Sequence, residues 1–93
     1  MKRWKLLIFV NLGKFRKKPN KASADDTVKM MEEFKNRGIK VLNWYWTLGR
    51  YDTVFIFEAA NEKEALKLST GIAEWVATET LVAIPRQEAL NLL

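Results

Sequence analysis

The side chains most able to do chemistry in this sequence are carboxylates, because the chain contains neither histidine nor cysteine. Their absence removes the usual general base, the thiolate nucleophile, the commonest zinc ligands and any disulfide. Glu79 stands out among the acids because it lies within an apolar stretch, where a carboxylate needs a partner. In a dry cleft it would hold a proton more tightly and could act as a general base, whereas beside Arg50 or Arg86 it would be structural. We favour the structural interpretation.

Four consecutive residues, Gly49-Arg50-Tyr51-Asp52, separate two segments typical of strands. Gly49 can take the positive φ that a tight hairpin requires, and the Asp52 carboxylate can accept hydrogen bonds from nearby backbone N–H groups. We therefore expect a β-hairpin here, with Asp52 hydrogen-bonded and Arg50 in an ion pair with a nearby acid.

The same turn also has a functional interpretation, since nothing in hairpin geometry requires an aromatic residue at Tyr51. In this alternative, Arg50 anchors an anion and Tyr51 covers a cleft that is lined by tryptophan. The candidate ligand-binding residues are then Trp44, Trp46, Arg50, Tyr51, Asp52 and Glu79.

No motif indicates a metal or a cofactor. The glycines form neither a dinucleotide fingerprint nor a phosphate-binding loop. The paired acids Asp25 and Asp26 fit the start of a helix, and those at 32–33 fit a solvated helix face. We expect no cofactor and no metal, and the sequence leaves open whether the protein is an enzyme.

Positive charge is concentrated at one end of the chain, which carries a net charge of +5. Residues 1–21 hold eight of the sixteen basic residues and none of the eleven acidic ones, so residues 22–93 have a net charge of −3. A local positive field attracts phosphate, although a solvated loop is the simpler explanation. The candidate nucleic-acid contacts are Lys14, Arg16, Lys17, Lys18 and Lys21.

RNA binding is one alternative function. Residues 8–12 resemble the first-strand motif of RNA-recognition domains with one residue missing. The octapeptide expected on the third strand matches residues 50–57 only at its first and last positions. Asp52 would stand where an aromatic ring should stack on a base, so the missing motif counts against RNA.

Strand-forming residues gather in four segments that are bounded by turn signals. The predicted strands are Trp4–Leu12, Ile39–Leu48, Thr53–Ala59 and Trp75–Ile84. In the second of these, alternation places Leu42, Trp44, Trp46 and Leu48 on one face.

Helix signals fill the intervals between the strands. Ser23 is expected to cap a first helix that ends near Gly38, with acids in its first turn. Asn61 with Glu64 marks the start of a second helix, and Pro85 is expected to open a short third helix over residues 86–92.

The resulting order, β-α-β-β-α-β, predicts an α+β ferredoxin-like domain over residues 1–93, with a four-stranded antiparallel sheet and two helices on one face. The first two strands carry apolar residues on both faces, so the uncovered face needs a partner. We expect a homodimer or higher oligomer through that face, resembling a dimeric α/β-barrel. The space between the two sheets is either a cleft for a small molecule or a packed core.

The hairpin from Tyr45 to Asp52 resembles the signature of the GYD domain family, which has a glycine, a tyrosine and an aspartate at this turn. The strand Thr78-Glu79-Thr80-Leu81 and the segment Leu12-Gly13-Lys14-Phe15 are also similar to that family. The resemblance implies a small prokaryotic ferredoxin-like protein, commonly dimeric. It implies no activity, because the family is of unknown function.

No segment reaches the roughly 20 apolar residues that a membrane span requires. The five-residue apolar run after the basic N-terminus is too short for a signal peptide, so we expect a cytoplasmic protein. The favoured function is a homo-oligomeric ligand-binding or regulatory module. The alternatives are an RNA-binding domain that uses the basic residues of 14–21, and a small cofactor-free enzyme that uses a carboxylate such as Glu79.

Overall fold

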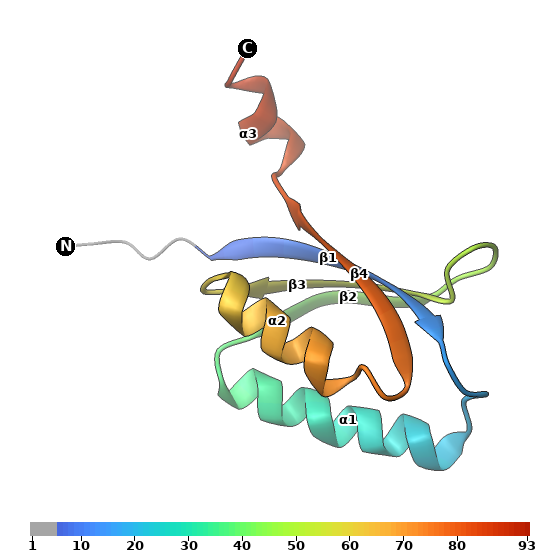
Figure 1. The fold of residues 1–93 in the computed structure, drawn as a ribbon. Helices are drawn as coiled ribbons and strands as arrows, with labels where there is room; N and C mark the ends of the chain where they lie inside the picture. Colours follow the sequence, from blue (N-terminus) through green and yellow to red (C-terminus); the bar gives the residue numbers. More distant parts are fainter. Residues whose placement is uncertain (1–5) are drawn as a thin grey trace.

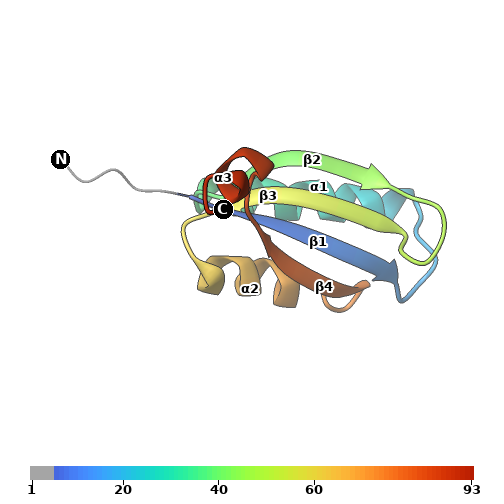
Figure 2. The same ribbon diagram turned by 90° about the horizontal axis from the view of Figure 1, so that it is seen from above.

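The computed structural model describes residues 6–93, which form a four-stranded antiparallel sheet with helices α1 and α2 on one face (Figure 1). The strands are β1 (Leu7–Phe15), β2 (Lys40–Trp46), β3 (Thr53–Ala59) and β4 (Val76–Ala83), and the helices are α1 (Lys21–Asn36), α2 (Glu62–Gly71) and α3 (Arg86–Leu90). The strand order is β2-β3-β1-β4, which the view from above shows across the sheet (Figure 2). This arrangement confirms the expected ferredoxin-like fold. Trp4, assigned to the first predicted strand, lies outside the described residues.

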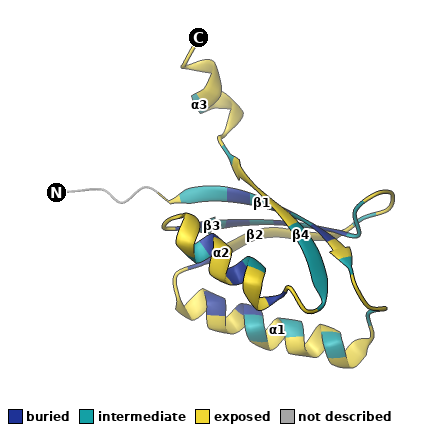
Figure 3. Ribbon diagram, in the orientation of Figure 1, coloured by how far each residue is buried: buried dark blue, intermediate teal, exposed yellow. Residues whose placement is uncertain are grey.

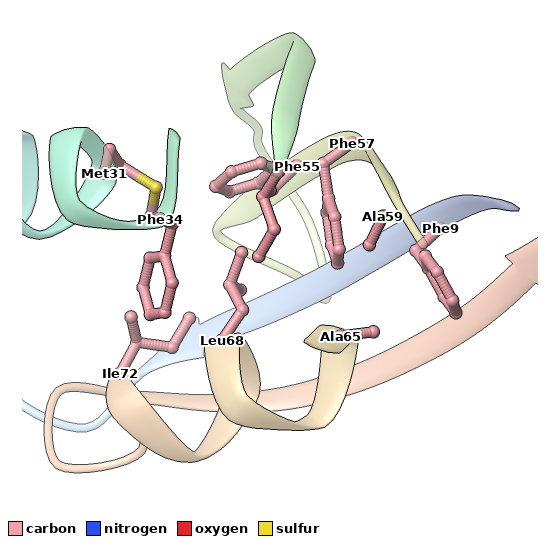
Figure 4. Packing of buried hydrophobic residues seen from close by; sticks show 10 residues of the cluster. Phe9, Met31, Phe34, Phe55, Phe57, Ala59, Ala65, Leu68 and Ile72 are labelled. Carbon is pink, nitrogen blue, oxygen red and sulfur yellow. The ribbon is translucent and has the colours of Figure 1, made fainter. Parts of the chain in front are cut away.

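The core lies between the sheet and the two helices (Figure 4). Alternate residues of β1 and β3 point into it, because side chains on a strand alternate between the two faces. Phe9 and Phe57 stack there with their ring centroids 5.3 Å apart. Full burial of such a side chain stabilises a fold by about 1.5–3 kcal/mol. The buried hydrophobic residues are Phe9, Met31, Phe34, Ile39, Phe55, Phe57, Ala59, Ala65, Leu68 and Ile72.

A β-bulge in β2 changes which residues share a face. The pairing with β3 shifts register between Val41 and Asn43, so Val41 faces the helices together with Trp44 and Trp46. The alternation that puts Leu42, Trp44 and Trp46 on one face implies that Val41 lies on the other face. This was wrong, because the extra residue of a bulge is invisible in the sequence pattern. The strand also ends two residues earlier than predicted, and Leu48 is fully exposed in the hairpin loop.

The first helix begins earlier than predicted because Asn20, not Ser23, is its N-cap. The Asn20 side chain accepts a hydrogen bond from the Ser23 backbone N–H at 2.9 Å, and the Ser23 hydroxyl accepts one from the Asn20 N–H at 3.0 Å. This reciprocal capping box leaves no acid in the first turn, so that expectation was also wrong. The strand before it has the predicted length but lies three residues further along the chain, from Leu7 to Phe15.

Other turn and cap predictions are confirmed. The Asn61 side chain caps α2 by accepting from the Glu64 N–H at 3.0 Å. Gly38 follows α1 with φ of +88°, and Gly49 takes φ of +99° in the hairpin. Pro85 precedes α3, which ends at Leu90 rather than Leu92. No helix within residues 6–93 is long and apolar enough to cross a membrane.

Gly13 is the glycine with the least room around it, because a Cβ there would meet the Thr53 hydroxyl and lie 2.7 Å from Val76 Cγ1. We expect Gly13→Ala to lower the free energy of unfolding by about 1–3 kcal/mol, the usual cost of overpacking. Urea denaturation would measure the loss, with the exposed neighbour Lys14→Ala as the control. Equal stability of the two variants would contradict the prediction and show that β3 and β4 can move away from Gly13 at little cost.

Candidate functional site

A cavity of about 540 Å³ lies between the first half of α1 and the helix-covered face of the sheet. Its walls are largely aromatic, and the five rings come from three strands and the loop before β4. These are Phe15, Trp44, Trp46, Phe55 and Trp75. Ring contacts link the wall: Trp44 stacks on Phe55 at 5.3 Å, and Phe15 meets the edge of Trp46 at 5.2 Å. The cavity is therefore a preformed aromatic site within one chain.

The residue pattern of α1 explains why this space is open. The face that α1 turns toward the cavity carries small side chains in its first two turns, including Ser23, Ala24 and Thr27. Large core side chains begin only with Met31 and Phe34, which are buried. A helix can approach a sheet only as closely as its side chains fill the interface. The second half of α1 is therefore packed, and the first half leaves a cavity.

Two side-chain amides line the cavity: Asn20 at the start of α1, which caps the helix, and Asn11 on the sheet. Asn11 lines the cavity and is 1% exposed, and its Nδ2 donates to the Thr80 hydroxyl at 2.8 Å and to the Ser69 hydroxyl at 3.5 Å. Ser69 and Thr80 are themselves hydrogen-bonded at 2.9 Å, so they hold the amide in one orientation. The hydrogen bonds of the Asn11 side chain within residues 6–93 use its nitrogen, and a side-chain amide also carries an acceptor oxygen.

Neither α1 nor α2 packs on the opposite face of the sheet, and we call this face the open face. The strand pairing places on it the side chains that do not point into the core. Most are aliphatic, namely Ile8, Val10, Leu12, Val54, Ile56 and Leu81, and Tyr45 adds an aromatic ring. Leu81 is 45% exposed and Tyr45 is 52% exposed, so this face is a second candidate interaction surface.

The structure divides the six predicted ligand-binding residues between these two faces. Trp44 and Trp46 line the cavity on the helix side. Tyr51 instead meets Glu79, which pairs with Leu12 and so lies on the open face. One cleft containing all six residues is therefore not formed within the chain.

The hairpin residues have partners other than those expected. The Tyr51 hydroxyl donates to Glu79 Oε2 at 2.7 Å, and the Arg50 guanidinium lies 5.7 Å from the centre of the Tyr51 ring. Among the described residues, Arg50 forms no ion pair, and Glu79 pairs with neither Arg50 nor Arg86. The predicted ion pairs of Arg50 and of Glu79 were therefore both wrong. The Tyr51 hydroxyl binds the Glu79 carboxylate, and the Tyr51 ring lies against the Arg50 guanidinium.

Asp52 is hydrogen-bonded as predicted, but to another strand. Its Oδ2 accepts from the Phe15 backbone N–H at 2.8 Å, and its own N–H donates to the Gly13 carbonyl at 2.8 Å. The turn is thereby fastened to the end of β1. This places Phe15 beside Trp46, so Asp52 shapes the cavity wall without lining it.

The hydrogen bond to Glu79 raises the pKa of Tyr51 above its usual value of 10.0. Partial desolvation and the negative charge of Glu79 act in the same direction, and Arg50 opposes them. Tyr51 is therefore a protonated donor at neutral pH and not a base. Glu79 is exposed in the single chain, so the dry surroundings that a carboxylate base needs are missing there.

The basic residues do not gather on the open face. Arg16 donates from Nε to the Ala73 carbonyl at 2.7 Å, and Lys17 lies 3.6 Å from Glu74. Lys18 lies at the cavity, Lys21 begins α1, and Lys14 is exposed at the end of β1. Of these five residues, the strand register places only Lys14 on the open face.

Asn11, Phe15, Met31 and Trp75 are cavity residues that sequence reasoning missed. The usable signal was the run of small residues on one side of α1, opposite a strand that carries two tryptophans. That signal becomes readable only when the pairing of helix and strand is known.

The GYD domain family model matches residues 10–93 of the chain. The comparison found no match among curated proteins and none among solved structures. The matched segment includes the cavity, the hairpin and β4.

Replacement of Glu79, which accepts the Tyr51 hydrogen bond, should change the titration of Tyr51. In a Tyr45→Phe background, only Tyr51 titrates as a phenol, because the chain has two tyrosines. We expect Glu79→Gln to lower the pKa of Tyr51 toward 10.0, measured by tyrosinate absorbance, whereas Glu58→Gln should not. Because the folded-state pKa is raised, the stabilisation from this hydrogen bond is present below about pH 10 and lost as the pH rises through the higher value. An unchanged titration in Glu79→Gln would contradict the contact.

Loss of the Asp52 carboxylate should destabilise the fold. Asp52→Ala leaves the Phe15 N–H without its acceptor, which costs about 1–2 kcal/mol in the free energy of unfolding. Asp52→Asn keeps an acceptor oxygen and should recover part of that loss in urea denaturation. If neither variant changes stability, the carboxylate does not fasten the hairpin.

Proposed function

The chain belongs to the GYD domain family, and we propose that it is a small-molecule-binding module that holds a flat, largely apolar ligand between α1 and the sheet. The observation that carries the proposal is the aromatic cavity of about 540 Å³. Its volume lies within the roughly 300–1,000 Å³ typical of small-molecule sites. Such sites combine apolar walls with few polar groups, and Asn11 supplies one here.

The lining favours a particular ligand chemistry. The rings of Trp44, Trp46 and Trp75 offer surfaces on which an aromatic molecule can stack. The Asn11 carbonyl oxygen favours a ligand with one hydroxyl or N–H donor. Charged residues of both signs line the cavity, namely Lys17, Lys18 and Asp26, and Lys17 is already paired with Glu74, so the net charge of the ligand is not strongly selected. A phenolic or other hydroxylated aromatic compound fits this set of contacts.

The second part of the proposal is that the module is a homo-oligomer joined through the open face. The aliphatic side chains of that face give it a reason to be covered. Its flat, aliphatic character favours a packed interface over a second ligand cleft between two sheets.

Neither alternative function gains support from these contacts. RNA-recognition sheets stack bases on aromatic side chains, whereas the open face presents mainly aliphatic ones and holds only Lys14 of the five basic candidates. An enzyme based on Glu79 would need a carboxylate free to take a proton from a substrate, and this one already accepts a hydrogen bond from Tyr51.

Filling the cavity should abolish binding. Thr27 lines the cavity, and its hydroxyl donates to the carbonyl four residues earlier. We expect Thr27→Phe to weaken binding of the probe 2-naphthol by about tenfold or more, because about 1.4 kcal/mol of lost contact corresponds to a tenfold change. Tryptophan fluorescence and calorimetry would measure the affinity.

Thr70→Phe is the matched control, because Thr70 makes the same kind of backbone contact on the exposed side of α2. Binding by this variant should equal that of the unmodified chain. Equal binding by Thr27→Phe and Thr70→Phe would place the naphthol elsewhere, and absence of binding to any flat aromatic probe would overturn the proposed function.

A further inference from the structure

The last ten residues leave the sheet and carry apolar side chains into solvent. We call Ile84–Leu93 the C-terminal arm. Ile84 is 59% exposed, Leu92 is 78% exposed and Leu93 is fully exposed. No residue of α3, which forms the middle of the arm, is buried (Figure 3). An ordered helix without a buried residue lacks the packing that normally stabilises a segment of five residues.

The departure of the arm follows from the sequence. Pro85 has no N–H to continue the ladder of β4, so the chain turns away from the sheet at this residue. Figure 1 shows the arm on the side of the sheet opposite α1 and α2, which is the side of the open face. Two uncovered apolar features, the arm and the open face, therefore share one side of the molecule. The family model extends through residue 93, so the arm is part of the matched domain.

The charge on this side favours a second copy of the chain over a phosphate-bearing partner. The strand pairing places two basic and two acidic residues on the open face: Lys14, Lys40, Glu58 and Glu79. Lys40 directly faces Glu58 across the β2–β3 pair. In a two-fold dimer each surface meets its own copy, which a strongly basic face would resist and a balanced face allows.

We propose that a second copy of this chain covers the open face and that the two C-terminal arms are exchanged, each packing its leucines on the other chain. The inference rests on the sheet-face homo-oligomer proposed above and adds the arm to the interface. The exchange would cover Leu90 and Leu92, which the arm carries away from its own sheet. Each chain would then use its arm to cover apolar surface of the other chain.

Sedimentation equilibrium at micromolar concentration tests both parts. The unmodified chain should have twice the mass of 10.8 kDa. The exposed open-face substitution Leu81→Lys should give a monomer. The double substitution Leu90→Lys, Leu92→Lys should raise the dimer dissociation constant by about a hundredfold or more, because each buried leucine contributes at least about tenfold.

Leu66→Lys is the matched control, since Leu66 is 63% exposed on α2, on the other side of the sheet. It adds the same charge and should leave the dimer unchanged, and circular dichroism would show that all variants fold. A dimer whose dissociation constant is unaffected by the arm substitution overturns the exchange and leaves the sheet-face dimer standing. A monomeric unmodified chain overturns both, and a monomer that binds single-stranded RNA through the face would assign the surface to RNA. Naphthol binding by the monomeric Leu81→Lys variant would separate this inference from the ligand site.

Discussion

The distance at which α1 can pack against the sheet is the constraint on which the rest of the structure depends. Met31 and Phe34 hold the second half of the helix against the core, while the small side chains before them cannot reach the strands. Close packing is normally completed by side chains of matching size. Here the tryptophans of β2 line the space opposite the small side chains and stay 39% and 63% exposed, and the result is a cavity with aromatic walls.

The hairpin and the first strand keep that cavity in shape. Asp52 joins the turn to the end of β1, and this contact sets Phe15 against Trp46. The Gly-Arg-Tyr-Asp turn is therefore tied to the site through its aspartate. The tyrosine of the same turn acts on the other face, where it donates to Glu79. One short motif thus serves both surfaces of the sheet.

The two faces differ in chemistry because their neighbours differ. The helix face is aromatic and contains the fixed Asn11 amide, which suits a small ligand. The open face is mainly aliphatic and carries equal numbers of basic and acidic residues, which suits contact with the open face of a second copy. On the loop between β1 and α1, Arg16 and Lys17 contact the segment before β4.

Local signals in the sequence determined the order of elements, and with it the ferredoxin-like fold. Alternating apolar residues, Asn61 with Glu64, and the glycines at 38 and 49 each act over a few residues. The GYD resemblance was likewise carried by short motifs, and the family match confirms it. The N-cap of α1 was misassigned because Asn20 and Ser23 are both good caps, and only the backbone geometry distinguishes them.

Tertiary structure alone decided which residues share a site. The bulge in β2 placed Val41 beside the tryptophans, and the register of β4 placed Glu79 opposite the cavity. The partners of Arg50 and Glu79 were wrong in the sequence prediction because charge alone does not reveal that Tyr51 lies between them. Side chains far apart in the sequence meet through strand register and helix packing, and neither is encoded in the spacing of the residues that meet.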